Sequence, residues 1–238
     1  EIFYNSILSG PKTHIINQLS NIITALGAVP ERGFAALADY PLSLLQARSR
    51  TRFLGEVPAN IVGMAKGLPE GVRGALFVWK NGIPPAQLTK WEFRPKAFTG
   101  ISGRIINFPS TLLEMADAMM RGINYRGALS STIYRIAKQG GLKGKALLER
   151  IAELELNPSQ KIMQEAAKIA EYRLFRQPAG KFTAKLMGLR DTEILGFPAL
   201  RFVIPFLRTP INLVKFGLER SPLGVFNPKL WQTLVTRN

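Results

Sequence analysis

The chain contains no cysteine, only one histidine and no long run of apolar residues. The lack of cysteine excludes disulfides, thiolate metal ligands and cysteine nucleophiles, and it leaves the redox compartment undetermined. A histidine-based metal site or a Ser-His-Asp triad would depend entirely on His14, which has no carboxylate in its sequence neighbourhood. We interpret His14 as a polar residue in the first turn of a helix.

The sequence also lacks a conventional transmembrane segment. Its longest stretch without Asp, Glu, Lys or Arg runs from Thr13 to Pro30 and is interrupted by the polar residues Asn17, Gln18, Ser20 and Asn21. A spanning helix needs about 20 predominantly apolar residues, so this stretch is a poor candidate. No secretory signal pattern is visible. Because the chain begins at Glu1, we expect a piece of a longer polypeptide.

Acidic residues are scarce relative to basic ones. The chain has 32 Lys and Arg against 16 Asp and Glu, a net charge of +16, and yet 46% of its residues are hydrophobic. The excess is spread along the whole chain, so no detachable basic arm is present. A disordered basic tail would lack the apolar half, and an ordinary soluble enzyme is rarely so unbalanced. We expect a folded body that attracts an acidic partner: nucleic acid, anionic lipid or protein.

Helical patterns dominate the first part of the chain. After Pro11, one apolar stripe has helical spacing: Ile15, Ile16, Leu19, Ile22, Ile23 and Leu26. Gly27 is a suitable C-terminal cap for this helix. A second helical segment is predicted for residues 31–48, interrupted near Pro41. Ala75–Trp79 and Trp91–Phe98 are weak strand signals, and the first is too short to decide.

More helices are predicted further along. Thr111 and Glu114 form a capping box that opens a helix ending at Gly122. Two more helices are predicted for 130–138 and 145–156, and Asn157-Pro158 starts another. With 21 Gly and 16 Pro, the fold class is mainly α: an irregular multi-helix assembly of short Gly/Pro-broken helices with little or no sheet. We divide it into regions 1–110, 111–194 and 195–238.

Small residues recur at every fourth position over six steps. This small-residue ladder consists of Gly55, Ala59, Gly63, Gly67, Gly71 and Ala75. On a helix it would form a face where another backbone can approach closely, as in helix pairs in lipid. Two alternatives stay open. The segment could be a Gly-rich connector interrupted by Pro58 and Pro69, or a membrane-embedded ladder, against which its charged residues count.

Basic and aromatic residues alternate in two places. The first cluster holds Lys90, Trp91, Phe93, Arg94 and Lys96, and the second holds Tyr172, Arg173, Phe175 and Arg176. Such mixtures can stack bases while they neutralise phosphates, which indicates possible nucleic-acid contact. The same mixture is typical of a helical core where it meets water.

The segment Leu195–Leu218 is apolar and basic. Arg201, Arg208 and Lys215 are seven residues apart, so they would form one row on a helix and contact an acidic partner or a membrane surface. Three prolines in the segment exclude one straight helix. The alternative is a kinked element that docks on the protein's own core or on a neighbouring subunit.

No enzyme signature is present. Residues 140–146 resemble a phosphate loop only superficially, because the G-x-x-x-x-G-K-[ST] spacing fails. The pairs Glu114/Asp117 and Glu149/Glu153 are interpreted as solvated charges near a helix start. A hydrolase would need a cleft that gathers Glu114, Asp117 or Glu149. We predict no catalytic residue, no cofactor, no metal and no small-molecule substrate.

Several phrases are distinctive: Tyr4–His14 near the start, Pro205–Asn212 with Glu219–Pro222 near the end, and Ala116-Asp117 with Tyr172-Arg173 between them. Together they resemble a region of very large internal virion proteins of tailed bacteriophages, which are packaged in the capsid and ejected with the genome. The resemblance covers nearly the whole chain in matching order. It defines a structural region and transfers no catalytic residue.

The resemblance implies an α-helical oligomer in the virion, inside the capsid or tail, and then in the host cell envelope. We therefore expect a structural component of a phage ejection apparatus that helps deliver the genome. Its partners would be copies of itself, other virion proteins, packaged DNA and the host membrane surface. The alternative is a nucleic-acid-binding structural module in which the basic-aromatic clusters converge on one groove.

Overall fold

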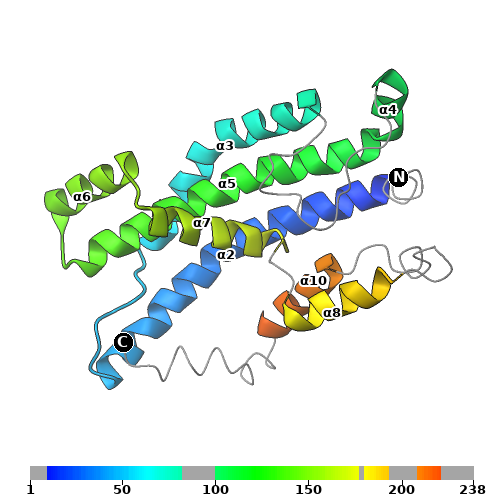
Figure 1. Cartoon of the computed structure of the whole chain (residues 1–238). Coiled ribbons are helices and arrows are strands. Elements are labelled where there is room, and N and C mark those ends of the chain that lie inside the picture. The colour runs from blue at the N-terminus through cyan, green and yellow to red at the C-terminus, as the bar shows by residue number, and fades with distance from the viewer. Residues whose placement is uncertain (1–9, 82–99, 177–179, 193–207, 221–238) are drawn as a thin grey trace. The chain divides into compact units, whose positions relative to one another are not determined.

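The computed structural model describes residues 10–81, 100–176, 180–192 and 208–220. These residues form eight helices and no strand (Figure 1): α2 (Pro11–Leu45), α3 (Glu56–Asn81), α4 (Gly100–Ile106), α5 (Phe108–Gln139), α6 (Gly144–Leu156), α7 (Gln160–Arg173), α8 (Lys181–Arg190) and α10 (Arg208–Arg220). The mainly α class is confirmed. The undecided segment Ala75–Trp79 is helical, and Trp91–Phe98 lies outside the described residues.

Two compact units follow one another along the chain, Glu1–Leu174 and Phe175–Asn238. Helices α2 to α7 belong to the first unit, and α8 and α10 belong to the second. The predicted boundary near residue 110 falls inside α5, and α3 and α5 pack together across it. The first unit therefore extends well past this boundary. The predicted boundary near residue 194 lies outside the described residues.

Three helices are longer than the short helices that the sequence predicts. Helix α2 has 35 residues, α3 has 26 and α5 has 32. Helix α2 continues through Gly27 and joins two predicted helices, with Pro30 and Pro41 inside it. Helix α5 likewise continues past Gly122. A glycine inside a helix costs about 1 kcal/mol, and tertiary packing outweighs such a cost; Gly122 packs directly on α3.

Two helix starts also differ from the predicted ones. Helix α5 begins at Phe108, so Thr111 is not its cap; the Thr111 Oγ1 donates to the Asn107 carbonyl at 2.8 Å instead. Helix α7 is capped by Ser159, whose Oγ accepts a hydrogen bond from the Ile162 N–H at 3.4 Å. The predicted capping box at Thr111 is therefore wrong. The N-terminal cap of α7, Ser159, lies two residues after the predicted cap, Asn157.

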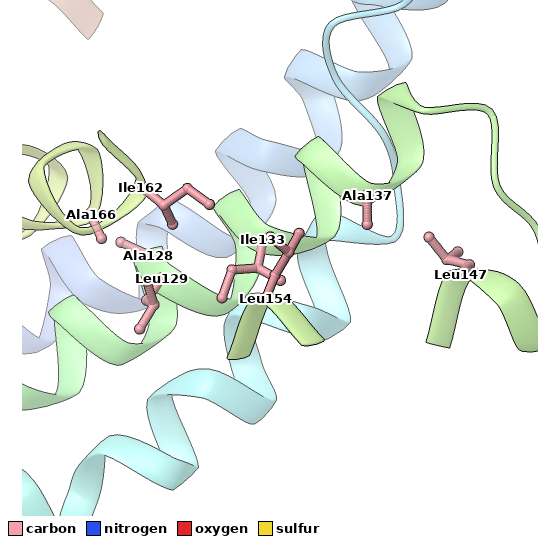
Figure 2. Packing of buried hydrophobic residues seen from close by; sticks show 8 residues of the cluster. All are labelled: Ala128, Leu129, Ile133, Ala137, Leu147, Leu154, Ile162 and Ala166. Carbon is pink, nitrogen blue, oxygen red and sulfur yellow. The ribbon is translucent and has the colours of Figure 1, made fainter. Parts of the chain in front are cut away.

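Helices α5, α6 and α7 share an apolar core. Figure 2 shows its eight buried residues: Ala128, Leu129, Ile133, Ala137, Leu147, Leu154, Ile162 and Ala166. Three of the α5 members, Leu129, Ile133 and Ala137, lie four residues apart, and Ala128 is next to the first of them, so one face of α5 meets both other helices. This core fixes the C-terminal half of α5, and α3 packs along α5 between Ala118 and Ser130 (Figure 1).

The second unit is built on contacts between α10, α8 and the chain before α8. The Asn212 side-chain N–H donates to the Phe175 carbonyl at 2.7 Å. The rings of Phe175 and Phe216 meet edge to face, with centroids 5.0 Å apart. The Arg220 guanidinium lies 3.4 Å from the Phe216 ring centroid, a cation–π contact that covers this ring pair.

A hydrogen-bonded corner joins the end of α2 to the start of α3. The buried Asp39 carboxylate accepts hydrogen bonds from Arg48 Nη2 at 2.8 Å, from the Thr51 N–H at 2.9 Å and from the Arg52 N–H at 3.1 Å. Burial alone would raise the pKa of the Asp39 carboxyl, but these hydrogen bonds outweigh it and lower the pKa.

Asp39→Asn is expected to reduce the free energy of unfolding by roughly 1–2 kcal/mol at pH 7, because it removes a charged acceptor. The lowered pKa means that the stabilisation is present above the unfolded-state pKa of Asp and is lost as the pH falls through the lower folded-state value. Urea unfolding at pH 7 and pH 3 tests this. The difference between wild type and variant should shrink at pH 3; a constant difference would contradict it.

Candidate functional site

The small-residue ladder lies along the contact between α3 and α5. A Cβ added to Gly63 would lie 2.5 Å from the Arg126 carbonyl oxygen, and one added to Gly71 would lie 2.5 Å from the Met119 carbonyl oxygen. At Gly67 the nearest atom would be the Gly122 carbonyl oxygen, at 2.8 Å. These distances are too short for any side chain. The backbones of α3 and α5 are therefore in direct contact at these three positions.

Both ends of the ladder have a different role. Gly55 precedes α3, and a Cβ there would overlap the ring of Tyr134 at 2.1 Å. Ala59 and Ala75 lie within α3 and are half-buried. As the residue number increases from Gly55 through Gly71, the contacted residue number on α5 decreases from Tyr134 to Met119. The two helices are therefore antiparallel. The segment is thus not a connector.

Helix α5 contributes small residues of its own. A Cβ on Gly122 would lie 2.6 Å from the Gly71 backbone nitrogen, and one on Gly127 would lie 2.6 Å from Met64 Cγ. Small residues on both helices allow this close approach, which large side chains on either would prevent. The regular spacing of small residues on α3 allowed this contact face to be predicted from the sequence. Gly122 and Gly127 on α5 follow no such repeat, so their part in the contact was not predicted.

Ion pairs flank the helix contact. Arg126 Nε on α5 lies 2.7 and 2.8 Å from the two carboxylate oxygens of Glu70 on α3, and this hydrogen bonding raises the pKa of Arg126. Lys66 Nζ on α3 lies 3.1 Å from a carboxylate oxygen of Glu155 on α6. Partly exposed pairs such as these contribute about 1 kcal/mol or less each, so they set the register more than the stability.

A buried charge cluster holds four helices together. The Glu56 side chain is 2% exposed, and its Oε2 lies 3.4 Å from Arg32, 3.8 Å from Arg135 and 3.9 Å from Arg52. Arg135 also pairs with Glu165 on α7. Burial lowers the pKa of the Arg32 guanidinium to about 10, although the Glu56 carboxylate favours its charged form. The cluster links α2, α3, α5 and α7, and sequence reasoning missed it.

The residues that α2 and α3 bury are mostly small or polar, unlike the apolar core of α5, α6 and α7. The buried residues of α2 are Asn21, Thr24, Ala25, Ala28, Ala36, Asp39 and Ser43. Helix α3 buries Glu56, Asn60, Gly63, Gly67, Gly71 and Val78. The Asp117 carboxylate on α5 accepts hydrogen bonds from Asn17 and Asn21 of α2 at 3.4 and 3.3 Å. Polar hydrogen bonding thus selects the side of α2 that faces α5.

The apolar stripe of α2 faces outward as a result. Its six residues are 43–67% exposed, and we name them the α2 apolar face: Ile15, Ile16, Leu19, Ile22, Ile23 and Leu26. The exposed apolar residues continue along α2 with Phe34, Leu37, Tyr40, Leu44 and Leu45. In a globular protein such a stripe normally covers the core. Contiguous exposed apolar residues of this kind are typical of interaction sites.

The predicted basic contacts are only partly described. Lys90, Trp91, Phe93, Arg94, Lys96 and Arg201 lie outside the described residues. Arg208 and Lys215 lie on α10, and Lys215 Nζ is 3.9 Å from Glu219 on the same helix. In the second basic-aromatic cluster, Arg173 is buried and donates to Asn124 Oδ1 at 3.3 Å. This buried arginine is therefore not positioned to contact nucleic acid.

The acidic pairs differ from one another. Glu149 and Glu153 are solvated, and each pairs with a basic residue of α6. Glu114 is buried and Asp117 bonds to α2, so the solvated interpretation of that pair is wrong. Within the described ranges, no group of three or more His, Cys, Asp and Glu residues is arranged to hold a metal ion.

None of the helices in the described parts of the chain is long and apolar enough to cross a membrane. Comparison with known protein families, with curated proteins and with solved structures found no match to this chain. The candidate site is therefore defined by geometry alone: a tight α3–α5 pair, a buried charge cluster and the outward α2 apolar face.

Proposed function

We propose that this chain is a non-enzymatic structural module that works by assembling with other protein chains, as part of a phage ejection apparatus. The observation that carries the proposal is the reversed distribution of side chains in the first unit. The residues that α2 and α3 bury are mostly small or polar, while large apolar residues of these two helices face outward. Such a surface is stable when a partner covers it.

The sequence resemblance supplies the setting. Internal virion proteins are packaged in the particle and pass to the host envelope with the genome, and the net charge of +16 suits an environment rich in packaged DNA. In this proposal, copies of the chain and other virion proteins cover the apolar surface in the particle. The basic side chains contact packaged DNA or, after ejection, the anionic membrane surface.

Mass spectrometry of purified particles of the phage that encodes the chain tests this proposal. We expect the polypeptide at a fixed copy number in intact particles, and in the host envelope fraction after genome ejection. Its detection only in the host cytosol as a monomer, with none in particles, would overturn the proposal. Capsid and tail proteins quantified in the same sample provide the copy-number standard.

The alternative, a nucleic-acid-binding module, depends on the cluster at residues 90–96. The test is DNA binding at several salt concentrations with Lys90, Arg94 and Lys96 changed together to alanine. A module of this kind would lose about three counterion contacts, which flattens the salt dependence. If the triple variant binds like the wild type, that cluster is not a nucleic-acid site.

A further inference from the structure

We propose that the α2 apolar face binds the same face of a second copy of this chain, as paired helices. This inference rests on the proposed function, because it names the surface through which the module assembles. It starts from the spacing along α2. Residues 15 and 22, 16 and 23, and 19 and 26 are each seven apart, and all six side chains are exposed. Seven-residue apolar spacing is the pattern into which a second helix interlocks.

Charge argues for a second copy rather than a lipid surface. Helices that lie in a membrane interface carry Lys and Arg along the border of the apolar face. Between Thr13 and Pro30 of α2 there is no Lys, Arg, Asp or Glu. Apart from Lys12 in its first turn, α2 offers no cation to anionic headgroups along this stretch, and two copies can approach there despite a net charge of +16 each.

Two charged residues further along α2 strengthen this argument. Arg32 pairs with the buried Glu56, and Asp39 pairs with Arg48, so both are held within their own chain. A partner with a strongly acidic helix would find few free cations on α2. A two-fold symmetric contact needs no second complementary surface, because the same face serves on both sides.

Length is sufficient for a stable contact. Helix α2 has 35 residues, which is about 50 Å at 1.5 Å per residue. Paired helices of coiled coils are built from seven-residue repeats, and 35 residues correspond to five such repeats. The exposed apolar residues extend from Ile15 to Leu45 and so cover nearly the whole helix. The buried side of α2 is already occupied by α5, which leaves this outer side for the second copy.

Disulfide cross-linking of the full chain tests the contact. Since the chain has no cysteine, single variants Leu19→Cys and Ile22→Cys report only on their own neighbours. We expect mild oxidation to give covalent dimers for at least one of them at micromolar concentration. Leu148→Cys on α6, which is 67% exposed, is the matched control and should stay monomeric. Equal cross-linking at all three positions would indicate random collision and overturn the proposal.

Charge introduction provides the second readout. The double variant Leu19→Glu with Leu26→Glu places like charges in the pairing face, and we expect it to weaken self-association at least 100-fold in analytical ultracentrifugation. Leu148→Glu with Leu156→Glu on α6 should leave it unchanged. Circular dichroism should show both variants as helical as the wild type, because all four positions are exposed.

Two outcomes would overturn the proposal. One is a wild-type chain that stays monomeric at about 100 µM with no cross-linking. The other is a chain that stays monomeric in buffer but binds phosphatidylglycerol vesicles through Leu19 and Leu26, which would make lipid the occupant of the face. Either result leaves the proposed function intact if the polypeptide is found in particles, so the two failures are distinguishable.

Discussion

Replacing Glu56 with alanine is expected to lower the free energy of unfolding of the first unit by about 3–5 kcal/mol. The carboxylate is the common partner of Arg32, Arg52 and Arg135, and the Arg135 side chain is only 9% exposed. Its removal takes the ion-pair partner from the mostly buried Arg32 guanidinium and leaves Arg135 paired with Glu165 alone, which costs more than the loss of an exposed ion pair. Urea unfolding followed by far-ultraviolet circular dichroism measures the change.

The matched control is Glu149→Ala on α6. Its side chain is 66% exposed and lies 3.7 Å from Lys145, so its removal should change the free energy of unfolding by less than about 0.5 kcal/mol. Glu56→Gln keeps the shape and an acceptor for the Phe53 N–H, which lies 3.0 Å from Glu56 Oε1, and should give an intermediate loss. Equal effects of the two alanine variants would show that the buried cluster does not stabilise the unit.

The second large effect is expected at the small-residue ladder. Gly63→Ala together with Gly71→Ala places each new methyl group 2.5 Å from a carbonyl oxygen of α5. Overpacking costs about 1–3 kcal/mol per site, and the better helix propensity of alanine returns up to about 1 kcal/mol at each. We expect a net loss of up to about 4 kcal/mol, measured by thermal and urea unfolding.

Gly27→Ala is the control for this pair. Gly27 also lies inside a long helix, but a Cβ there would meet nothing within 4 Å. Without a steric clash, only the higher helix propensity of alanine acts, so the variant should be more stable than the wild type by up to about 1 kcal/mol. The expected result is a decrease in the free energy of unfolding for the ladder variant and an increase for Gly27→Ala. A stabilised ladder variant would mean that α3 and α5 are not in backbone contact.

Sequence periodicity predicted the helical class, and it predicted that the small residues of α3 form one face for close helix contact. It did so because both depend on spacing within one segment. Helix ends were less predictable: Gly27 and Gly122 are ordinary stop signals, yet α2 and α5 continue past them. At Gly122 the reason is tertiary, since its lack of a side chain permits the contact with Gly71.

The charge cluster could not be predicted from spacing. Glu56 is 24 residues from Arg32 and 79 from Arg135, and only the packing of α2, α3 and α5 brings them together. The outward orientation of the α2 apolar face did leave a signal. Asn17, Asn21, Thr24 and Ala28 have the same helical spacing as the apolar residues and form a second, small and polar stripe. A pair of such stripes predicts a helix with two contact faces, not one.

Hydroxyl-radical footprinting of the full chain tests most directly whether its apolar surface is external. At concentrations low enough to keep the chain monomeric, Leu19, Ile22 and Leu26 should be oxidised readily, while Val78 and Ile133, both 0% exposed, should be protected. In particles, or at concentrations where the chain self-associates, the three α2 residues should become protected as well. Protection of Leu19, Ile22 and Leu26 in the monomer would contradict the outward apolar face and the assembly proposed from it.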